Sequence, residues 1–179
     1  MTKLLLHTCC GPCFLGVYED IQNKFEITNL FYNPNIQPKD EYLKRLKNLK
    51  IVTRDKSNDI LELEYIPAEH MRAIAGSEGE FPARCLKCYE LRLRRTAETA
   101  KKLSFNMFST TLLVSPYQKH EDLKEIGIKV ATEVGVEFYY TDWRPYFREG
   151  QRRAKALDVY RQKYCGCVWS EIESRKSST

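Results

Sequence analysis

The pattern of apolar and polar positions along the chain predicts short strands that alternate with amphipathic helices. Strand segments rich in aliphatic and aromatic residues are expected at Leu4–Leu6, Ile27–Tyr32, Leu61–Ile66, within Asn106–Val114 and at Val136–Tyr140. Helical segments are expected over residues 14–24, 41–54, 84–103, 120–134 and 151–163. Pro12 favours the start of the first helix, because its missing N–H would be unpaired in a first helical turn.

This alternation predicts an α/β fold with a mostly parallel five-stranded sheet and helices on both faces. In open sheets of this kind, ligands bind beyond the carboxyl ends of the strands, where the strand order reverses. Cys9, Cys10 and Cys13 follow the first strand, residues 110–117 end the fourth, and Asp142 follows the fifth. These segments line one crevice if the first and fourth strands are neighbours.

Length and composition favour a single domain with a buried core. The chain has 179 residues, of which 42% are hydrophobic, and we expect one domain over residues 1–170 and a polar tail over 171–179. No apolar run is long enough for a membrane helix. The apolar stretch at Leu4–Leu6 stops at His7 without a signal-peptide cleavage site. We therefore expect a cytoplasmic protein with no membrane contact.

The net charge of +5 is unevenly distributed. Residues 84–102 carry seven basic and two acidic side chains, and residues 144–163 carry the same numbers, so the rest of the chain is net negative. Concentrated positive charge favours a polyanion such as nucleic acid as a partner, although many charged helix faces are only solvated.

Cysteine supplies the most specific pattern. The seven cysteines fall into three clusters, Cys9-Cys10-Gly11-Pro12-Cys13, Cys85-Leu86-Lys87-Cys88 and Cys165-Gly166-Cys167. They are too few for a disulfide scaffold, and in a reducing cytosol clustered cysteines bind metal or carry out redox chemistry. We therefore expect the domain over residues 1–170 to bind metal.

The first two clusters contain the donors for one metal centre. Cys85 and Cys88 lie near a predicted helix start with their thiols on one side, and Arg84 and the helix N-terminus favour thiolates. The adjacent Cys9 and Cys10 can join them only if the chain leaves extended geometry. Four thiols suit a tetrahedral zinc ion or a [4Fe–4S] cluster, and the spacing does not separate the two. Alternatively, Cys85 and Cys88 are small buried apolar residues.

The third cluster has two interpretations. Cys165 and Cys167 are close enough for a disulfide in a small strained ring, and a strained disulfide is easily reduced, as in redox-active pairs. Alternatively, both are metal ligands, with Cys13 as a third. The sequence leaves these alternatives open.

Outside the cysteines, few residues carry recognisable chemistry. Asp142 is a candidate metal ligand or general acid, or else it caps a turn. His7 is expected to support the crevice, whereas His70 and His120 are expected at the surface or at helix starts. The sequence has neither a G-x-G-x-x-G motif nor a Walker phosphate loop, so nothing specifies a nucleotide cofactor.

Five motifs together resemble the QueH-type epoxyqueuosine reductases. The matching segments, in register over nearly the whole chain, are His7–Cys13, Phe31–Ile36, Cys85–Cys88, Thr110–Tyr117 and Tyr160–Cys167. The resemblance implies a three-layer Rossmann-like sheet of the kind found in adenine-nucleotide alpha-hydrolases. It also implies the last step of queuosine synthesis, in which the epoxide of epoxyqueuosine in tRNA becomes a cyclopentene.

The resemblance also assigns the cysteines. It implies that Cys9, Cys10, Cys85 and Cys88 hold a [4Fe–4S] cluster and that Cys165 and Cys167 form a redox-active pair. The Cys9–Cys13 segment stands where ATP-dependent relatives have a pyrophosphate loop, so nucleotide hydrolysis is not expected.

Removal of an epoxide oxygen as water takes two electrons, and a [4Fe–4S] cluster passes one at a time. The Cys165–Cys167 dithiol is one candidate for the second store, besides an external electron donor. A different hypothesis, which does not exclude the dithiol, is a mononuclear iron held by Cys13, Asp142 and one of that pair, which would act as a Lewis acid on the epoxide oxygen.

A tRNA substrate agrees with the charge distribution, because a modified base must leave the RNA loop to enter a crevice. Residues expected to bind the substrate lie in the motifs and in the basic segments, and they are Asn33, Thr111, Ser115, Tyr117, Arg152 and Arg153. Further candidates for phosphate contacts are Arg84, Arg92, Arg95 and Arg148, and for base stacking Trp143 and Tyr146.

Three other functions remain as alternatives. A zinc-stapled tRNA-binding module would use the thiolates only to hold the fold, and it would be colourless. An ATP-dependent tRNA-thiolating enzyme would share the sheet but consume ATP. A general thiol–disulfide oxidoreductase would leave four clustered thiols without a task.

Overall fold

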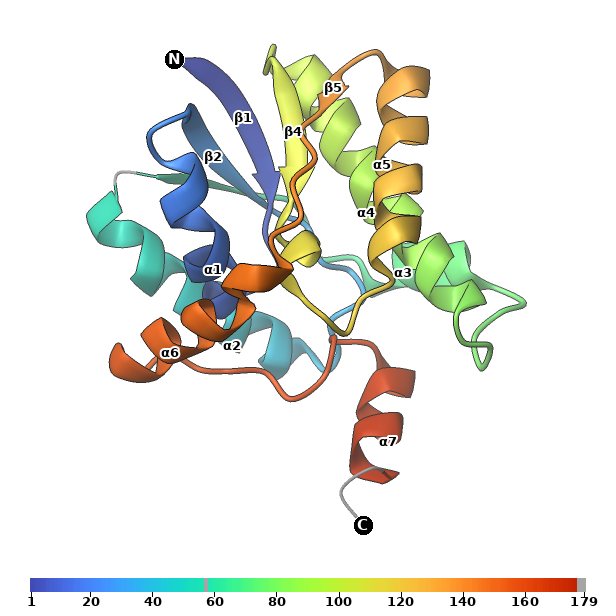
Figure 1. Cartoon of the computed structure of the whole chain (residues 1–179). Helices are drawn as coiled ribbons and strands as arrows, with labels where there is room; N and C mark the ends of the chain where they lie inside the picture. The colour runs from blue at the N-terminus through green and yellow to red at the C-terminus, as the bar shows by residue number, and fades with distance from the viewer. Residues whose placement is uncertain (57, 177–179) are drawn as a thin grey trace.

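A computed structural model of the chain describes residues 1–56 and 58–176. Its centre is a sheet whose strands are β1 (Thr2–His7), β2 (Phe25–Phe31), β3 (Asp59–Glu62), β4 (Met107–Thr110) and β5 (Glu137–Phe138). Neighbouring strands all pair in parallel, in the order β3-β2-β1-β4-β5 (Figure 1). The expected parallel five-stranded sheet is therefore confirmed, and β1 and β4 are neighbours.

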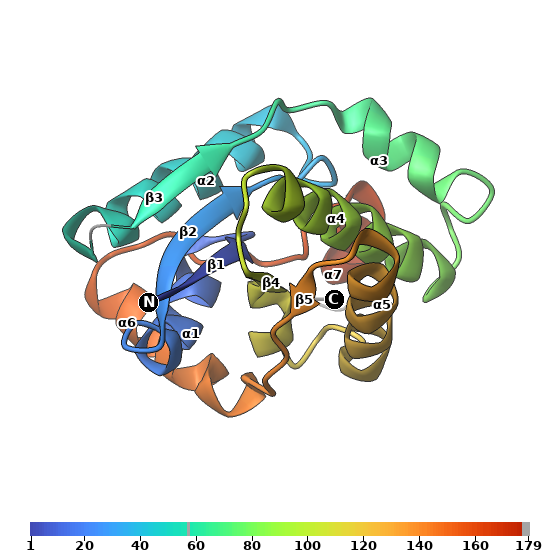
Figure 2. The ribbon, with the colours of Figure 1, turned by 90° about the horizontal axis from the view of Figure 1, so that it is seen from above.

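Helices cover both faces of this sheet. They are α1 (Gly11–Ile21), α2 (Lys39–Thr53), α3 (Pro67–Ile74), α4 (Ala83–Lys102), α5 (His120–Val134), α6 (Phe147–Ala156) and α7 (Val168–Lys176), with short turns η1 (Arg54–Lys56), η2 (Thr111–Val114) and η3 (Arg144–Tyr146). Helix α1 packs against α2 and α6, and α4 packs against α3 and α5, which gives the expected three-layer Rossmann-like arrangement (Figure 2). In the described part of the chain, no helix combines the length and apolarity that crossing a membrane requires.

Strand β1 forms the centre of the core. Leu4, Leu5 and Leu6 are fully buried, because β1 has strand neighbours on both sides and helices on both faces. Burial of each leucine side chain stabilises the fold by roughly 1.5–3 kcal/mol. The N–H of Thr8 still bonds to the carbonyl of Leu30, so the chain stays fixed to the sheet up to the residue before the first cysteine.

The last predicted helix is displaced towards the N-terminus. Helix α6 covers Phe147–Ala156 rather than 151–163. The N–H of Val159 bonds back to the carbonyl of Ala154, and Asp158 adopts a left-handed conformation with φ of 52°. This closing turn ends the helix and leaves residues 157–167 as a loop.

Three further segments differ from the expectations. Strand β3 ends at Glu62, since its partner β2 ends at Phe31 in the same register. Helix α3, which was not predicted, begins at Pro67, a residue suited to a first helical turn. The expected polar tail begins as α7, and its residues 177–179 lie outside the described residues.

Close contact between α1 and α6 brings the loop after α6 to the sheet edge. A side chain at Gly150 would place its Cβ 2.7 Å from the carbonyl oxygen of Pro12 and 2.9 Å from the backbone of Gly16. The missing side chains therefore allow the two helices to touch through their backbones. From there the chain crosses the carboxyl end of β1 and reaches Cys165.

Candidate metal and redox site

Three thiols gather where β1 turns into α1. Cys9, Cys10 and Cys13 are buried, and their sulfur atoms all lie within 4.8 Å of one another. The sulfurs of Cys9 and Cys10 are 3.7 Å apart. Strand β1 has already ended at His7, so two adjacent cysteines that would diverge in a regular strand converge here.

Neighbouring polar groups contact these thiols. The hydroxyl oxygen of Thr111 lies 3.6 Å from Cys9 Sγ and 3.4 Å from the Cys9 nitrogen. Gln162 Nε2 lies 2.9 Å from Cys10 Sγ and 3.8 Å from Cys13 Sγ, as donor to both. Gln162 belongs to the Tyr160–Cys167 motif, but nothing in the amino-acid sequence singled it out as a site residue.

The three thiols share their protons unequally. Hydrogen bonds from Cys10 and Cys13 lower the pKa of Cys9 well below its ordinary value. Burial raises the pKa of Cys10, and the hydrogen bonds that Cys13 makes to Cys10 and Cys9 raise the pKa of Cys13. The group therefore favours one thiolate, at Cys9, stabilised by two thiols.

The Cys165–Cys167 turn lies beside this group as a pair of thiols. Their sulfurs are 3.7 Å apart, and all seven cysteines in the described residues are free, so the expected disulfide is not formed in this structure. Gly166 has φ of 127°, and a Cβ there would approach Ile36 to 2.8 Å. Only glycine fits this turn.

The two thiols of the turn differ in acidity. Hydrogen bonding from Cys167 lowers the pKa of Cys165 to about 5 against the opposing effect of burial, with further help from Ser170. The same hydrogen bond raises the pKa of Cys167. At neutral pH, Cys165 is a thiolate and Cys167 keeps its proton.

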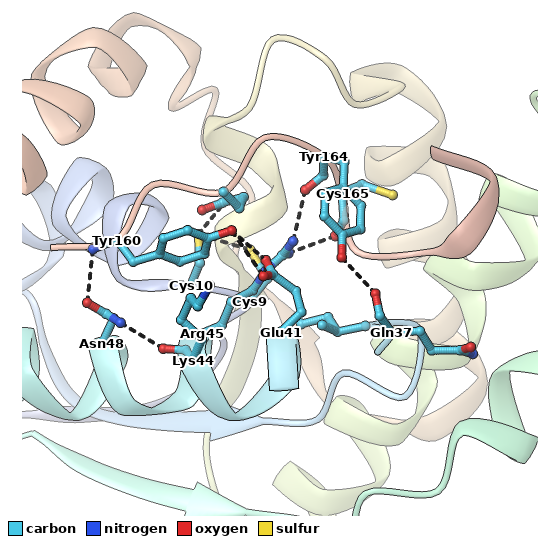
Figure 3. A network of polar contacts seen from close by, with 12 residues as sticks. Cys9, Cys10, Gln37, Glu41, Lys44, Arg45, Asn48, Tyr160, Tyr164 and Cys165 are labelled. Atoms are coloured by element: carbon cyan, nitrogen blue, oxygen red, sulfur yellow. Dashed lines mark hydrogen bonds and ion pairs between the residues drawn. The ribbon is translucent and has the colours of Figure 1, made fainter. Parts of the chain in front are cut away.

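Arg45 on α2 clamps this turn (Figure 3). Its side chain is 1% exposed, donates from Nε to Glu41 at 2.8 Å, and donates to the carbonyls of Tyr164 at 3.0 Å and Cys165 at 2.9 Å. The hydroxyl of Tyr160 donates to the same carboxylate at 3.0 Å. A buried ion pair thus fixes the backbone that carries Cys165 and Cys167.

Cys85 and Cys88 lie near the start of α4, and Cys85 lines the same cavity as Cys13 and Cys165. Burial raises the pKa of Cys85 to about 11 and also raises that of Cys88. Arg84 lowers the pKa of Cys85, as expected, but burial has the larger effect, so the net shift of both cysteines disfavours thiolates in the protein without a bound metal. The nearby charge of Cys165 raises both values further.

Arg92 connects all three clusters. It is buried, its Nε contacts the carbonyl of Cys88 at 3.4 Å, and the charges that most raise its pKa against burial are those of Cys88, Cys9 and Cys165. Arg92 was expected to contact phosphate, but it lies inside the protein among thiols. A buried cation in this place fits an anionic thiolate site, and the nearby group of Cys9, Cys10 and Cys13 could hold a metal or a cluster.

One cavity of about 510 Å³ opens onto the three clusters. Cys13, Cys85 and Cys165 line it, together with the predicted residues Ser115 and Tyr117. The expected convergence at the carboxyl edge of β1 and β4 is therefore present. Phe81, Arg84 and Tyr89 also line the cavity, of which only Arg84 was a candidate.

Asp142 lies apart from the thiols. Its carboxylate accepts hydrogen bonds from the backbone and guanidinium of Arg144, and it lies 3.7 Å from His120 Nε2. Its contact with Arg144 lowers the pKa of Asp142 to about 2 against the effect of burial. This geometry is that of a turn cap, and the metal-capable group in the described residues does not include Asp142.

The histidines and the other polar candidates have structural partners. His7 contacts Thr110 Oγ1 at 2.9 Å and the carbonyl of Tyr32 at 3.1 Å, as a support of the crevice should. His70 is buried within α3 rather than at the surface, and His120 is buried at the start of α5. Asn33 is buried and donates to the carbonyl of Thr8 at 3.0 Å.

Most of the candidate tRNA contacts also have protein partners. Arg152 and Arg153 both pair with Glu149, and Arg153 also pairs with Glu19. Arg95 pairs with Glu69. Arg148 and Tyr146 are exposed, whereas Trp143 is fully buried and belongs to the core.

Nearly the whole chain is similar to one family of known proteins. The family profile described as "Epoxyqueuosine reductase QueH" matches residues 4–173. A protein of that name from Dehalococcoides mccartyi is 36% identical over 173 residues, covering 96% of this chain and 93% of its own length. Another from Thermotoga maritima is 36% identical over 183 residues, covering 98% and 94%. A third, from Streptococcus pyogenes, is 32% identical over 178 residues, covering 94% and 70%.

Proposed function

Because the chain belongs to the epoxyqueuosine reductase QueH family, we propose that it reduces the epoxide of epoxyqueuosine in tRNA to the cyclopentene of queuosine. The observation that carries the proposal is the cavity lined by Cys13, Cys85 and Cys165, one member of each cysteine cluster. Its volume of about 510 Å³ accommodates the modified side ring of one base.

The thiols of Cys9, Cys10, Cys85 and Cys88 would hold a [4Fe–4S] cluster. Such a cluster, when bound, supplies electrons one at a time. Cys13 lies within 4.8 Å of Cys9 and Cys10, so it is a further donor. The buried charge of Arg92 offsets the negative charge of these thiolates.

The dithiol of Cys165 and Cys167 supplies the electron pair in this proposal. Conversion of an epoxide to an alkene and water consumes two electrons and two protons, and oxidation of a dithiol to a disulfide releases the same numbers. Cys165 is the thiolate and Cys167 the protonated partner, so one proton comes from Cys167 and the other from solvent. An external reductant then restores the dithiol.

A second mononuclear iron is the competing source of activation. Cys13 and Cys165 line the same cavity, which favours a shared ligand set there. Asp142, proposed as a third ligand from the sequence, is bound to Arg144 and would have to leave it. Iron content clearly above four per chain after reconstitution would favour this second site over the dithiol alone.

Anaerobic reconstitution with iron and sulfide tests the reductase proposal. The protein should be brown, bind about four irons per chain or more, and convert epoxyqueuosine in tRNA to queuosine with dithionite as reductant, measured by mass spectrometry of digested nucleosides. A colourless zinc protein without turnover would support a tRNA-binding module instead. Dependence on ATP, with sulfur left on a base, would support a thiolating enzyme.

A further inference from the structure

Arg84 holds an unusual position among the basic residues of the cavity. It lies in the first turn of α4, lines the cavity, and is only 3% exposed. Its Nη2 contacts the carboxylate of Glu173 on α7. Its Nε and Nη1 are buried and have no hydrogen-bond partner within the described ranges. Because buried guanidinium donors are costly to leave unpaired, Arg84 has capacity for a second anionic acceptor.

Exposed aromatic rings flank the same cavity. Phe81 lines it with 59% of its surface exposed, and the cations of Arg84 and Lys119 lie 5.9 and 5.4 Å from its ring. Tyr117 is 80% exposed and rests edge-on against Phe147. Exposed aromatic faces beside cations are the arrangement that binds single-stranded nucleic acid, with bases on the rings and phosphates on the cations.

Helix α7 lies at the surface and covers Arg84 through Glu173. It has no buried residue, although Ser170, Glu173 and Ser174 line the cavity, and it projects from the domain directly after Cys167 (Figure 1). The Glu173 side chain is 54% exposed, so its carboxylate can return to water when another anion binds Arg84. The Arg84–Glu173 pair can therefore be exchanged for a stronger contact with a substrate anion.

We propose that Arg84 is a phosphate subsite that binds a backbone phosphate next to the modified nucleotide, in exchange for Glu173. Phe81 and Tyr117 provide the stacking surfaces for the adjoining bases. This inference rests on the proposed function in taking RNA as the substrate. It places the phosphate subsite beside the Cys85 thiol, since Arg84 and Cys85 are consecutive and line the same cavity.

Binding of an RNA hairpin to the anaerobically prepared holoprotein tests the subsite. The probe is a tRNA stem-loop with an unmodified nucleotide at the position of the modified base, and its binding is followed by fluorescence anisotropy over a salt series. Arg84→Gln should weaken binding about ten- to hundredfold and flatten the log–log salt slope by roughly 0.7–0.9. Arg94→Gln, on the same helix but paired with Glu90 and Glu133, is the matched control and should change little.

Release of the competing carboxylate should have the opposite effect. Glu173→Gln should increase the affinity for the RNA several-fold relative to Glu171→Gln. The control removes the same charge from the same helix, but Glu171 pairs with Arg175 and not with Arg84. Equal effects of the two variants would overturn the exchange of Glu173 for phosphate.

Neutral phosphates identify the contact itself. Replacing one phosphate beside the modified nucleotide with methylphosphonate should weaken the binding of the RNA to the wild-type protein. The same replacement should not weaken the binding of the RNA to Arg84→Gln. It should also abolish the increase in affinity that Glu173→Gln causes. Additive losses at every position would overturn the proposal. The comparison of normal and methylphosphonate RNA on Glu173→Gln does not need Arg84→Gln, so it remains decisive if that variant fails to fold.

Two further results separate the proposals. If Arg84→Gln loses iron and visible absorbance while phosphate dependence is unchanged, Arg84 serves the thiols and the subsite is wrong. If phosphate dependence follows Arg84 but epoxyqueuosine is not reduced, the subsite holds and the reductase proposal fails.

Discussion

The Cys9–Cys13 segment and the Cys165–Cys167 turn meet at one cavity, but the fold holds them by different means. The first continues directly from the central strand β1, and its three thiols are buried in the main core. The second lies on a loop whose position depends on the side chains of Arg45 and Ser170 and on the absence of a side chain at Gly166. The central strand fixes the first thiol group through the backbone, whereas the buried Arg45–Glu41 pair and Ser170 fix the second through side chains from other elements.

Loss of a thiol at β1 should have the largest effect. Cys9→Ser and Cys10→Ser should abolish activity and most of the iron content, a loss greater than the roughly 10- to 100-fold caused by removing a supporting contact from a metal site. Cys13→Ser is the informative comparison, measured by iron analysis and absorbance. Retained iron in that variant would support the four-cysteine set without Cys13, and lost iron would support the geometric group of three.

Removal of the Arg45 clamp should act on the loop and not on the β1 thiols. Arg45→Gln leaves Glu41 buried without its cation, so the free energy of unfolding should fall by about 3–5 kcal/mol in urea denaturation. Arg45→Gln combined with Glu41→Gln should recover much of this loss yet keep low turnover, since the Tyr164 and Cys165 carbonyls lose a donor. Full turnover in the double variant would contradict a positioning role.

The acidity of Cys165 gives a pH test of the same loop. Alkylation by iodoacetamide in the metal-free protein, resolved by peptide mass spectrometry, should be faster at Cys165 than at Cys167 at pH 7. A lowered pKa means that the thiolate persists to lower pH. As the pH is lowered, the alkylation rate of Cys165 should therefore fall with a midpoint near pH 5. Ser170→Ala should raise that midpoint, as it removes a hydrogen bond that lowers the pKa. A midpoint near pH 9 would show an unperturbed thiol.

Surface arginines on α6 should have the smallest effect. Charge reversal at Arg152 and Arg153 should weaken tRNA binding only a few-fold and slightly flatten its salt dependence, because both side chains already pair with Glu149. The comparison is with Arg84→Gln in the same salt titration. A larger loss of tRNA affinity from the α6 variants than from Arg84→Gln would indicate that the RNA binds along α6 and not at the cavity.

Sequence alone was sufficient for the parts of this protein that depend on local pattern. The alternating segments predicted a parallel five-stranded sheet, the cysteine spacing predicted a thiol site, and the five motifs identified the family. The position of the Cys9–Cys13 segment at the end of β1 followed from the same pattern, because the carboxyl ends of parallel strands share one edge. These properties depend on residues that are close together in the sequence.

Contacts between distant segments were decided only by the tertiary structure. In the sequence, Arg92 is one of many basic residues on a charged helix, yet in the structure it is buried near the charges of thiols from three clusters. Asp142 follows a strand, as a metal ligand would, yet its carboxylate binds Arg144. Gln162, Arg45 and Phe81 acquire roles only from neighbours more than a hundred residues away or from a shared cavity. The acidity of each thiol likewise depends on burial and on the charges that folding places around it, which no local pattern contains.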